Sequence, residues 1–252
     1  MISLPQAIIL SIIQGITEWF PISSSGHLAL TQHFFGFQNL PFDVYLHLAS
    51  ILAVLIIFKK DILNLLNLKN KQNIKYIFLI IIAIIPAFIF GILFKKYITA
   101  SFHNLTFIGI FFIFSGLIIY LTKFTKETRT EIKSTEALFI GLMQVFALFP
   151  GISRSGMTIS AGLFTGLKKQ QVIKFSFLLA IPLILGASLA EAPQIINLNI
   201  AYPTLLISFI ITLITSLITI KFLLKIIKSN KFYLFGIYNI VLGILVLGYS
   251  LF

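Results

Sequence analysis

The stretch that decides the fold runs from residue 14 to residue 27: Gln-Gly-Ile-Thr-Glu-Trp-Phe-Pro-Ile-Ser-Ser-Ser-Gly-His. It interrupts an apolar segment, 4–20, with a proline and a polar run whose backbone is tolerated at membrane depth only inside protein or a wet cavity. The same pattern returns at 149–158, Phe-Pro-Gly-Ile-Ser-Arg-Ser-Gly-Met-Thr, after a second apolar segment, 136–149. We therefore predict that each broken segment is a helical hairpin that enters and leaves the membrane on one side. The alternative is a pair of ordinary spans with loops outside the membrane.

The composition places the rest of the chain in a membrane as well. Of 252 residues, 58% are hydrophobic and 10% are charged, whereas soluble domains carry about 25% charged residues. We expect no removable signal peptide, because no basic segment precedes the first apolar run. The absence of cysteine excludes disulfides and thiolate metal sites. Six further runs are apolar and long enough to cross a hydrocarbon core of about 30 Å: 42–58, 76–94, 105–121, 175–191, 203–224 and 232–252.

The two broken segments divide the chain into repeats. Each is followed by a short helix and then by three spans, so that the second copy must be inserted upside down. The predicted fold class is therefore all-α: a polytopic membrane protein with six transmembrane helices, two re-entrant helical hairpins and an inverted-topology repeat. We predict one membrane domain, 1–252, with internal repeats at approximately 1–125 and 130–252. Inverted repeats place their binding site near the midplane, where the broken helices meet.

The net charge of +12 comes from clusters between apolar runs. Segments 59–75, 123–135, 168–174 and 221–231 hold 16 of the 18 basic residues outside the second motif. Such clusters are typical of cytoplasmic loops beside anionic headgroups and argue against a nucleic-acid partner. The distribution predicts that both termini lie outside, with the first hairpin entering from outside and the second from the cytoplasm.

The first motif offers groups that suit phosphate chemistry. Gln14 and Glu18 are four residues apart and share a helix face, and an ionisable residue in such a segment indicates a functional site. Ser23, Ser24 and His27 follow at the start of the next helix, where free N–H groups favour an anion. Simple explanations are that Glu18 reaches a headgroup boundary and that one serine caps the helix.

The second motif repeats the pattern and adds a fixed positive charge. Arg154 is the one arginine in an apolar stretch, and its guanidinium can bind two phosphate oxygens at once. Thr158, four residues later, shares its helix face. A structural pair between Arg154 and Glu18 is the simpler alternative. His33, His47 and His103 lack an acidic or serine-rich neighbourhood, although His47 follows Asp43 by one turn, and we expect them outside the site.

The two motifs resemble the signatures of the undecaprenyl pyrophosphate phosphatase family, the bacitracin-resistance phosphatases. The resemblance covers nearly the whole chain, including Phe42-Asp43-Val44 and the run 175–182, Phe-Ser-Phe-Leu-Leu-Ala-Ile-Pro. It implies hydrolysis of undecaprenyl pyrophosphate to the monophosphate in the bacterial inner membrane, which recycles the lipid carrier for cell-wall synthesis. It also implies a divalent cation, Mg²⁺ or Ca²⁺.

The resemblance assigns roles to residues by their position in the motifs. Glu18 would hold the metal or act as base, Arg154 would clamp the phosphates, and His27 would protonate the leaving group or activate a nucleophile. Ser24 would be that nucleophile or a phosphate ligand. Many relatives carry Glu in place of Gln14, so this chain has one carboxylate where a scheme with two would need a pair. The predicted substrate-binding residues are Gln14, Ser23, Ser25, Gly26, Ser153, Ser155, Gly156 and Thr158.

Two other readings share some of these residues. A transporter or flippase of a prenyl phosphate lipid could use the same inverted-repeat site without chemistry. A second family of lipid phosphatases also has Ser-Gly-His and Ser-Arg elements, but it needs a nucleophilic histidine after the Ser-Arg, and this chain has no histidine after His103. The sequence leaves open whether the protein is a monomer or a homodimer.

Overall fold

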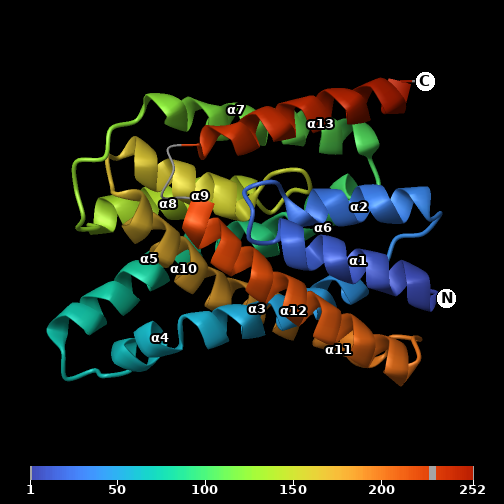
Figure 1. Cartoon of the computed structure of the whole chain (residues 1–252), viewed down its shortest axis with the longest axis horizontal. Coiled ribbons are helices and arrows are strands. Elements are labelled where there is room, and N and C mark those ends of the chain that lie inside the picture. The colour runs from blue at the N-terminus through green and yellow to red at the C-terminus, as the bar shows by residue number, and fades with distance from the viewer. Residues whose placement is uncertain (1, 227–230, 252) are drawn as a thin grey trace.

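The computed structural model describes residues 2–226 and 231–251 as a bundle of helices of unequal length. The chain runs as a short helix, a break and a second short helix, then longer helices, and it repeats this order in its second half (Figure 1). The first half holds α1 (Leu4–Thr17), α2 (Ser24–Phe34), α3 (Leu40–Ile57), α4 (Lys59–Leu65), α5 (Lys71–Leu93), α6 (Lys95–Ser101), α7 (Leu105–Leu121) and the 3₁₀ turn Thr122–Phe124. The second holds α8 (Ser134–Phe146), α9 (Arg154–Phe164), α10 (Lys169–Ala190), α11 (Ala192–Ile196), α12 (Tyr202–Ile226) and α13 (Tyr233–Leu251).

Within the described residues, six helices are long and apolar enough to cross a membrane: α3, α5, α7, α10, α12 and α13. They correspond to the six predicted spans, and the all-α polytopic fold class is confirmed. The largest difference in a boundary is at α10, which begins at Lys169 rather than near 175. Its first turns carry Lys169 and Lys174, so the helix extends beyond the apolar run that the sequence reveals. The short helices α4, α6 and α11 were not predicted.

The two broken segments fold as helical hairpins. α1 has 14 residues and α8 has 13, which at about 1.5 Å per residue gives roughly 20 Å, too short for a hydrocarbon core of about 30 Å. After each break the chain turns back, so that α2 packs on α1 and α9 on α8. The hairpins approach from opposite ends of the bundle, and their tips meet near its middle (Figure 1).

The helix packing is consistent with two interlocked units. α1 of the first half packs on α12 of the second, and α8 of the second packs on α5 of the first. The pairs α3 with α10 and α7 with α13 also join the two halves. An inverted duplication predicts such exchanges, although the repeat boundaries near residues 125 and 130 remain a prediction.

Glycines set the distance between α7 and α13. Gly109 and Gly116 on α7 face Gly243 and Gly236 on α13. A β-carbon added to Gly116 would lie 2.7 Å from the carbonyl oxygen of Gly236, and one added to Gly236 would lie 2.6 Å from that of Gly116. Small residues allow helix backbones to approach closely in membranes, where packing rather than hydrophobic burial drives association.

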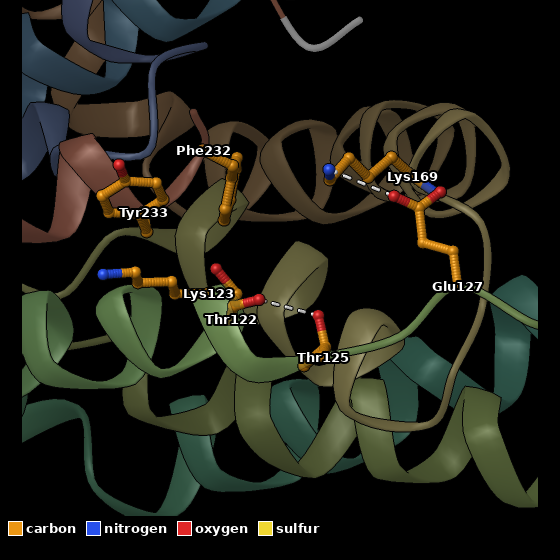
Figure 2. A pocket seen from close by; sticks show the side chains of 7 residues that line it. All are labelled: Thr122, Lys123, Thr125, Glu127, Lys169, Phe232 and Tyr233. Carbon is orange, nitrogen blue, oxygen red and sulfur yellow. Dashed lines mark hydrogen bonds and ion pairs between the residues drawn. The ribbon is translucent and has the colours of Figure 1, made fainter. Parts of the chain in front are cut away.

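Three of the basic segments gather at one end of the bundle. Ion pairs tie segments 59–75, 123–135 and 168–174 together: Lys174 with Asp61, Lys75 with Glu131, and Lys169 with Glu127. The hydrogen bond and charge of Lys75 also lower the pKa of the exposed Glu131 carboxyl. A cavity of about 300 Å³ lies among these segments, and Figure 2 shows its lining residues, Thr122, Lys123, Thr125, Glu127, Lys169, Phe232 and Tyr233. No residue of either broken motif lines this cavity.

Candidate functional site

The first hairpin turns through a strained serine. α1 ends at Thr17, and Ser23 precedes α2. The backbone of Ser23 has φ at 67°, a conformation that residues other than glycine rarely adopt. The turn places the Ser23 hydroxyl so that it accepts hydrogen bonds from Gly26 N (3.3 Å) and from Gly151 N on the other hairpin (3.1 Å). Ser23 therefore caps its own helix and joins the two tips.

The second hairpin meets the first through close backbone contact. Gly151 has φ at 99°, which favours glycine, and a β-carbon on Gly26 would lie 2.8 Å from Gly151 N. Ser153 caps α9 by accepting from Gly156 N at 3.0 Å, and Ser155 donates to the carbonyl of Phe20 at 3.2 Å. This geometry agrees with the prediction that the broken helices meet inside the bundle. The same contact brings the N-termini of α2 and α9 to one region, where their free N–H groups can bind an anion.

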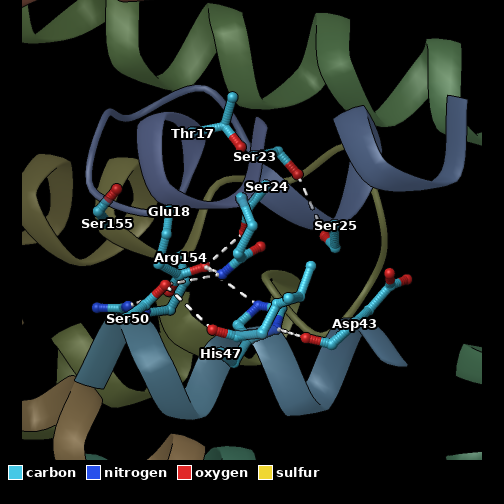
Figure 3. A network of polar contacts seen from close by, with 12 residues as sticks. Thr17, Glu18, Ser23, Ser24, Ser25, Asp43, His47, Ser50, Arg154 and Ser155 are labelled. Carbon is cyan, nitrogen blue, oxygen red and sulfur yellow. Dashed lines mark hydrogen bonds and ion pairs between the residues drawn. The ribbon is translucent and has the colours of Figure 1, made fainter. Parts of the chain in front are cut away.

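Glu18 lies at the centre of a buried polar network. Its Oε1 accepts a hydrogen bond from Arg154 Nη2 at 2.6 Å, and its Oε2 accepts from Ser24 Oγ at 2.5 Å and from Gln14 Nε2 at 3.2 Å. Glu18 is 6% exposed and Ser24 is 9% exposed. Figure 3 shows the side chains of Glu18, Ser24 and Arg154 converging above one face of α3. Four residues that the sequence singled out are thus brought together from α1, α2 and α9.

Arg154 is held on three sides. Besides Glu18, its Nη1 donates to the carbonyl of Ser176 on α10 at 3.3 Å, and its guanidinium carbon lies 5.6 Å from the centre of the Trp19 ring. Thr158 shares a hydrogen bond with the Ser176 hydroxyl at 2.7 Å, so its side chain faces α10. The second motif therefore contributes one charged group to the network, and α10 fixes its position.

His27 lies apart from Glu18 in this structure. Its Nδ1 donates to the carbonyl of Ser23 at 2.7 Å, and its Nε2 lies 2.8 Å from the hydroxyl of Tyr238 on α13. The two rings are stacked with their centroids 5.8 Å apart. Ser25 likewise contacts Ser23 at 3.3 Å rather than Glu18. The predicted chemical role of His27 remains a prediction; in this structure the side chain attaches the first loop to α13.

His47 contacts Glu18 directly, so the expectation that His47 lies outside the site is wrong. Its Nε2 lies 3.1 Å from Glu18 Oε2, and its Nδ1 lies 2.6 Å from the carbonyl of Asp43. Because a carbonyl and an ionised carboxylate can only accept, both ring nitrogens carry protons when Glu18 is ionised. One feature of the sequence could have indicated His47 as a site residue. Asp43, His47 and Ser50 are polar residues within an apolar span, and their spacing of four and three places all of them on one helix face.

The network offers a partial set of ligands for a divalent cation. Glu18 supplies one carboxylate, and the buried Gln14 Oε1 has no hydrogen-bond partner in the described structure. The described ranges contain no group of three or more His, Asp or Glu side chains that could hold a metal ion. Mg²⁺ typically uses one or two carboxylates together with substrate phosphates. The residues therefore fit a cation that is shared with a phosphorylated substrate, and do not form a complete cage.

Comparison with known proteins supports the family resemblance that the two motifs indicate. The family model described as the bacitracin resistance protein BacA matches residues 7–245. The chain belongs to this family. Among the curated proteins similar to this chain is an undecaprenyl-diphosphatase from Caldicellulosiruptor bescii, 38% identical over 257 residues, which cover 98% of this chain and 97% of the relative. Undecaprenyl-diphosphatase 1 from Shouchella clausii is 37% identical over 264 residues, which cover 97% and 95%. The resemblance inferred from the motifs is confirmed.

Proposed function

We propose that this BacA-family protein is an undecaprenyl-diphosphatase, an integral membrane phosphatase that hydrolyses undecaprenyl pyrophosphate to undecaprenyl phosphate and inorganic phosphate. The observation that carries the proposal is the hydrogen bond of 2.5 Å from the Ser24 hydroxyl to Glu18, with Arg154 on the other carboxylate oxygen. A hydroxyl on a base that a third group orients is the arrangement of an activated nucleophile. Full-length similarity to proteins named undecaprenyl-diphosphatase supplies the substrate.

The geometry supports a two-step transfer. Ser24 Oγ attacks the terminal phosphorus while Glu18 takes its proton, and undecaprenyl phosphate leaves with the bridging oxygen. Water then attacks the phosphoserine, and Glu18 returns its proton to the leaving Ser24 oxygen. Inorganic phosphate departs with both protons of the water, and the serine and the carboxylate are restored. Arg154 and the N-termini of α2 and α9 stabilise the negative charge on the transferred group, which is the main task of a protein in phosphoryl transfer.

A divalent cation, Mg²⁺ or Ca²⁺, belongs to the same proposal. Glu18 and the free Oε1 of Gln14 would hold it beside the substrate oxygens, and it would neutralise part of the diphosphate charge. The six apolar helices make the protein a multi-pass membrane protein. The bacterial inner membrane, where the product would return to cell-wall synthesis, is the proposed location.

The deciding experiment measures phosphate released from undecaprenyl pyrophosphate by the purified protein, with Mg²⁺, with Ca²⁺ and with a chelator. We expect turnover with metal, and loss of more than about 100-fold for Ser24→Ala, since nucleophile and base act as a unit. Ser250→Ala, which removes a hydroxyl on α13 remote from the network, is the matched control. Movement of the intact lipid across a vesicle membrane without phosphate release would replace the phosphatase with a flippase.

A further inference from the structure

Glu18 has one partner that belongs to neither motif. Three of its contacts come from the hairpins, through Gln14, Ser24 and Arg154, and the fourth comes from His47 in the middle of α3. Oε1 faces Arg154, whereas Oε2 faces the other three. Without His47, Oε2 would be held only by Gln14 and Ser24, which both belong to the first hairpin.

We propose that His47 is a positioning residue: it fixes the orientation of the Glu18 carboxylate from α3, so that Oε2 faces the Ser24 hydroxyl. The catalytic part of this inference rests on the proposed function. The contact itself, His47 Nε2 to Glu18 Oε2 at 3.1 Å, does not.

α3 is suited to act as a fixed support for the carboxylate. It packs on α10 and α12 of the second half as well as on α1, and its centre is closely packed, with Leu46 and Ala49 fully buried. The ring of His47 is fixed in turn, because Nδ1 binds the carbonyl of Asp43 one turn earlier. Its side chain is 20% exposed, so it borders the site rather than lying in the core.

The same face of α3 also holds the neighbour of Glu18. One turn after His47, the Ser50 hydroxyl lies 3.3 Å from Gln14 Nε2, and Ser216 of α12 donates to Ser50 at 3.2 Å. Hydrogen bonds thus lead from α12 through Ser50 of α3 to Gln14, and from Gln14 to Glu18. Hydrogen bonds of this kind keep the Gln14 and Glu18 side chains in a fixed geometry. Catalysis depends on that geometry, because a small displacement of a catalytic group lowers the reaction rate strongly.

The first test compares His47→Leu with His47→Gln, using His103→Leu as the matched control at an exposed loop. Loss of a hydrogen bond to a charged group predicts that His47→Leu lowers kcat by about 10- to 100-fold. KM should change less than about threefold, because the phosphates are bound by other groups. His47→Gln can still donate to Oε2 and should recover most of the loss. Equal losses for Leu and Gln, or a kcat per folded molecule within about twofold of wild type for Leu, would overturn the positioning role.

The second test needs no activity. The chain has four histidines, so selective nitrogen-15 labelling gives four pairs of ring signals, and His47→Gln identifies the pair of His47. Glu18→Gln should shift that pair and leave the signals of His103 unchanged. If the His47 signals do not move, the contact is absent and the inference fails. If they move but the wild type releases no phosphate, the contact stands and the proposed function fails instead.

Discussion

Replacing Arg154 with lysine keeps the positive charge but removes the fork of the guanidinium. Arg154 uses one terminal nitrogen for Glu18 and the other for the carbonyl of Ser176, and it lies over Trp19. A lysine ammonium is a single point on a flexible stem and cannot make both contacts in the same geometry. At least one charge-assisted hydrogen bond is therefore lost, which costs about 1.5–3 kcal/mol.

If that cost falls on the transition state, kcat/KM drops by about 10- to 150-fold. The assay is phosphate release from undecaprenyl pyrophosphate by the purified variant, with folded protein quantified by its elution in detergent. Arg129→Lys is the matched control, because Arg129 is the other arginine of the chain and pairs with Glu136 at the basic end. Wild-type turnover by well-folded Arg154→Lys would refute the clamp.

Two further predictions concern the first hairpin and the helix packing. Glu18→Gln should reduce phosphate release to background, since it removes the carboxylate that Arg154 and Ser24 contact. Gln14→Glu should keep activity and change the relative response to Mg²⁺ and Ca²⁺; equal tolerance at both positions would exclude both from metal binding. Gly236→Ala should lower the thermal unfolding midpoint by several degrees, because its β-carbon would lie 2.6 Å from a carbonyl oxygen of α7. Gly248→Ala on the same helix meets no atom within 4 Å, so an equal fall there would contradict the packing argument.

The sequence predicted the six spans and the two hairpins because each has a strong physical signature. A long apolar run can cross lipid as a helix, because a helix satisfies its own backbone hydrogen bonds. The two shorter helices, α1 and α8, both end just before a proline and a serine-rich run. Gln14, Glu18, Ser24 and Arg154 were found for the same reason, since polar groups in such segments are costly without a role.

The partners of those residues could not be derived in the same way. His27 is close to Glu18 along the chain, but the turn at Ser23 directs its ring to Tyr238 on α13. His47 is far from Glu18 along the chain, and the packing of α3 against α1 brings it into contact. The turn at Ser23, with its positive φ, separates His27 from Glu18 in space although the two are close along the chain. That backbone conformation could not be predicted from the sequence.

The distance along the chain between Glu18 and Arg154 also matters while the protein is being made. The two residues are separated by 136 positions, and ribosomes add about 5–20 residues per second. Glu18 therefore waits on the order of ten seconds for its guanidinium after it leaves the ribosome. His47 is made with α3, the first of the long apolar helices, so this contact of Glu18 becomes available well before Arg154. The order of synthesis thus supplies the contacts of Glu18 in sequence: the first hairpin, then α3, and last the second hairpin.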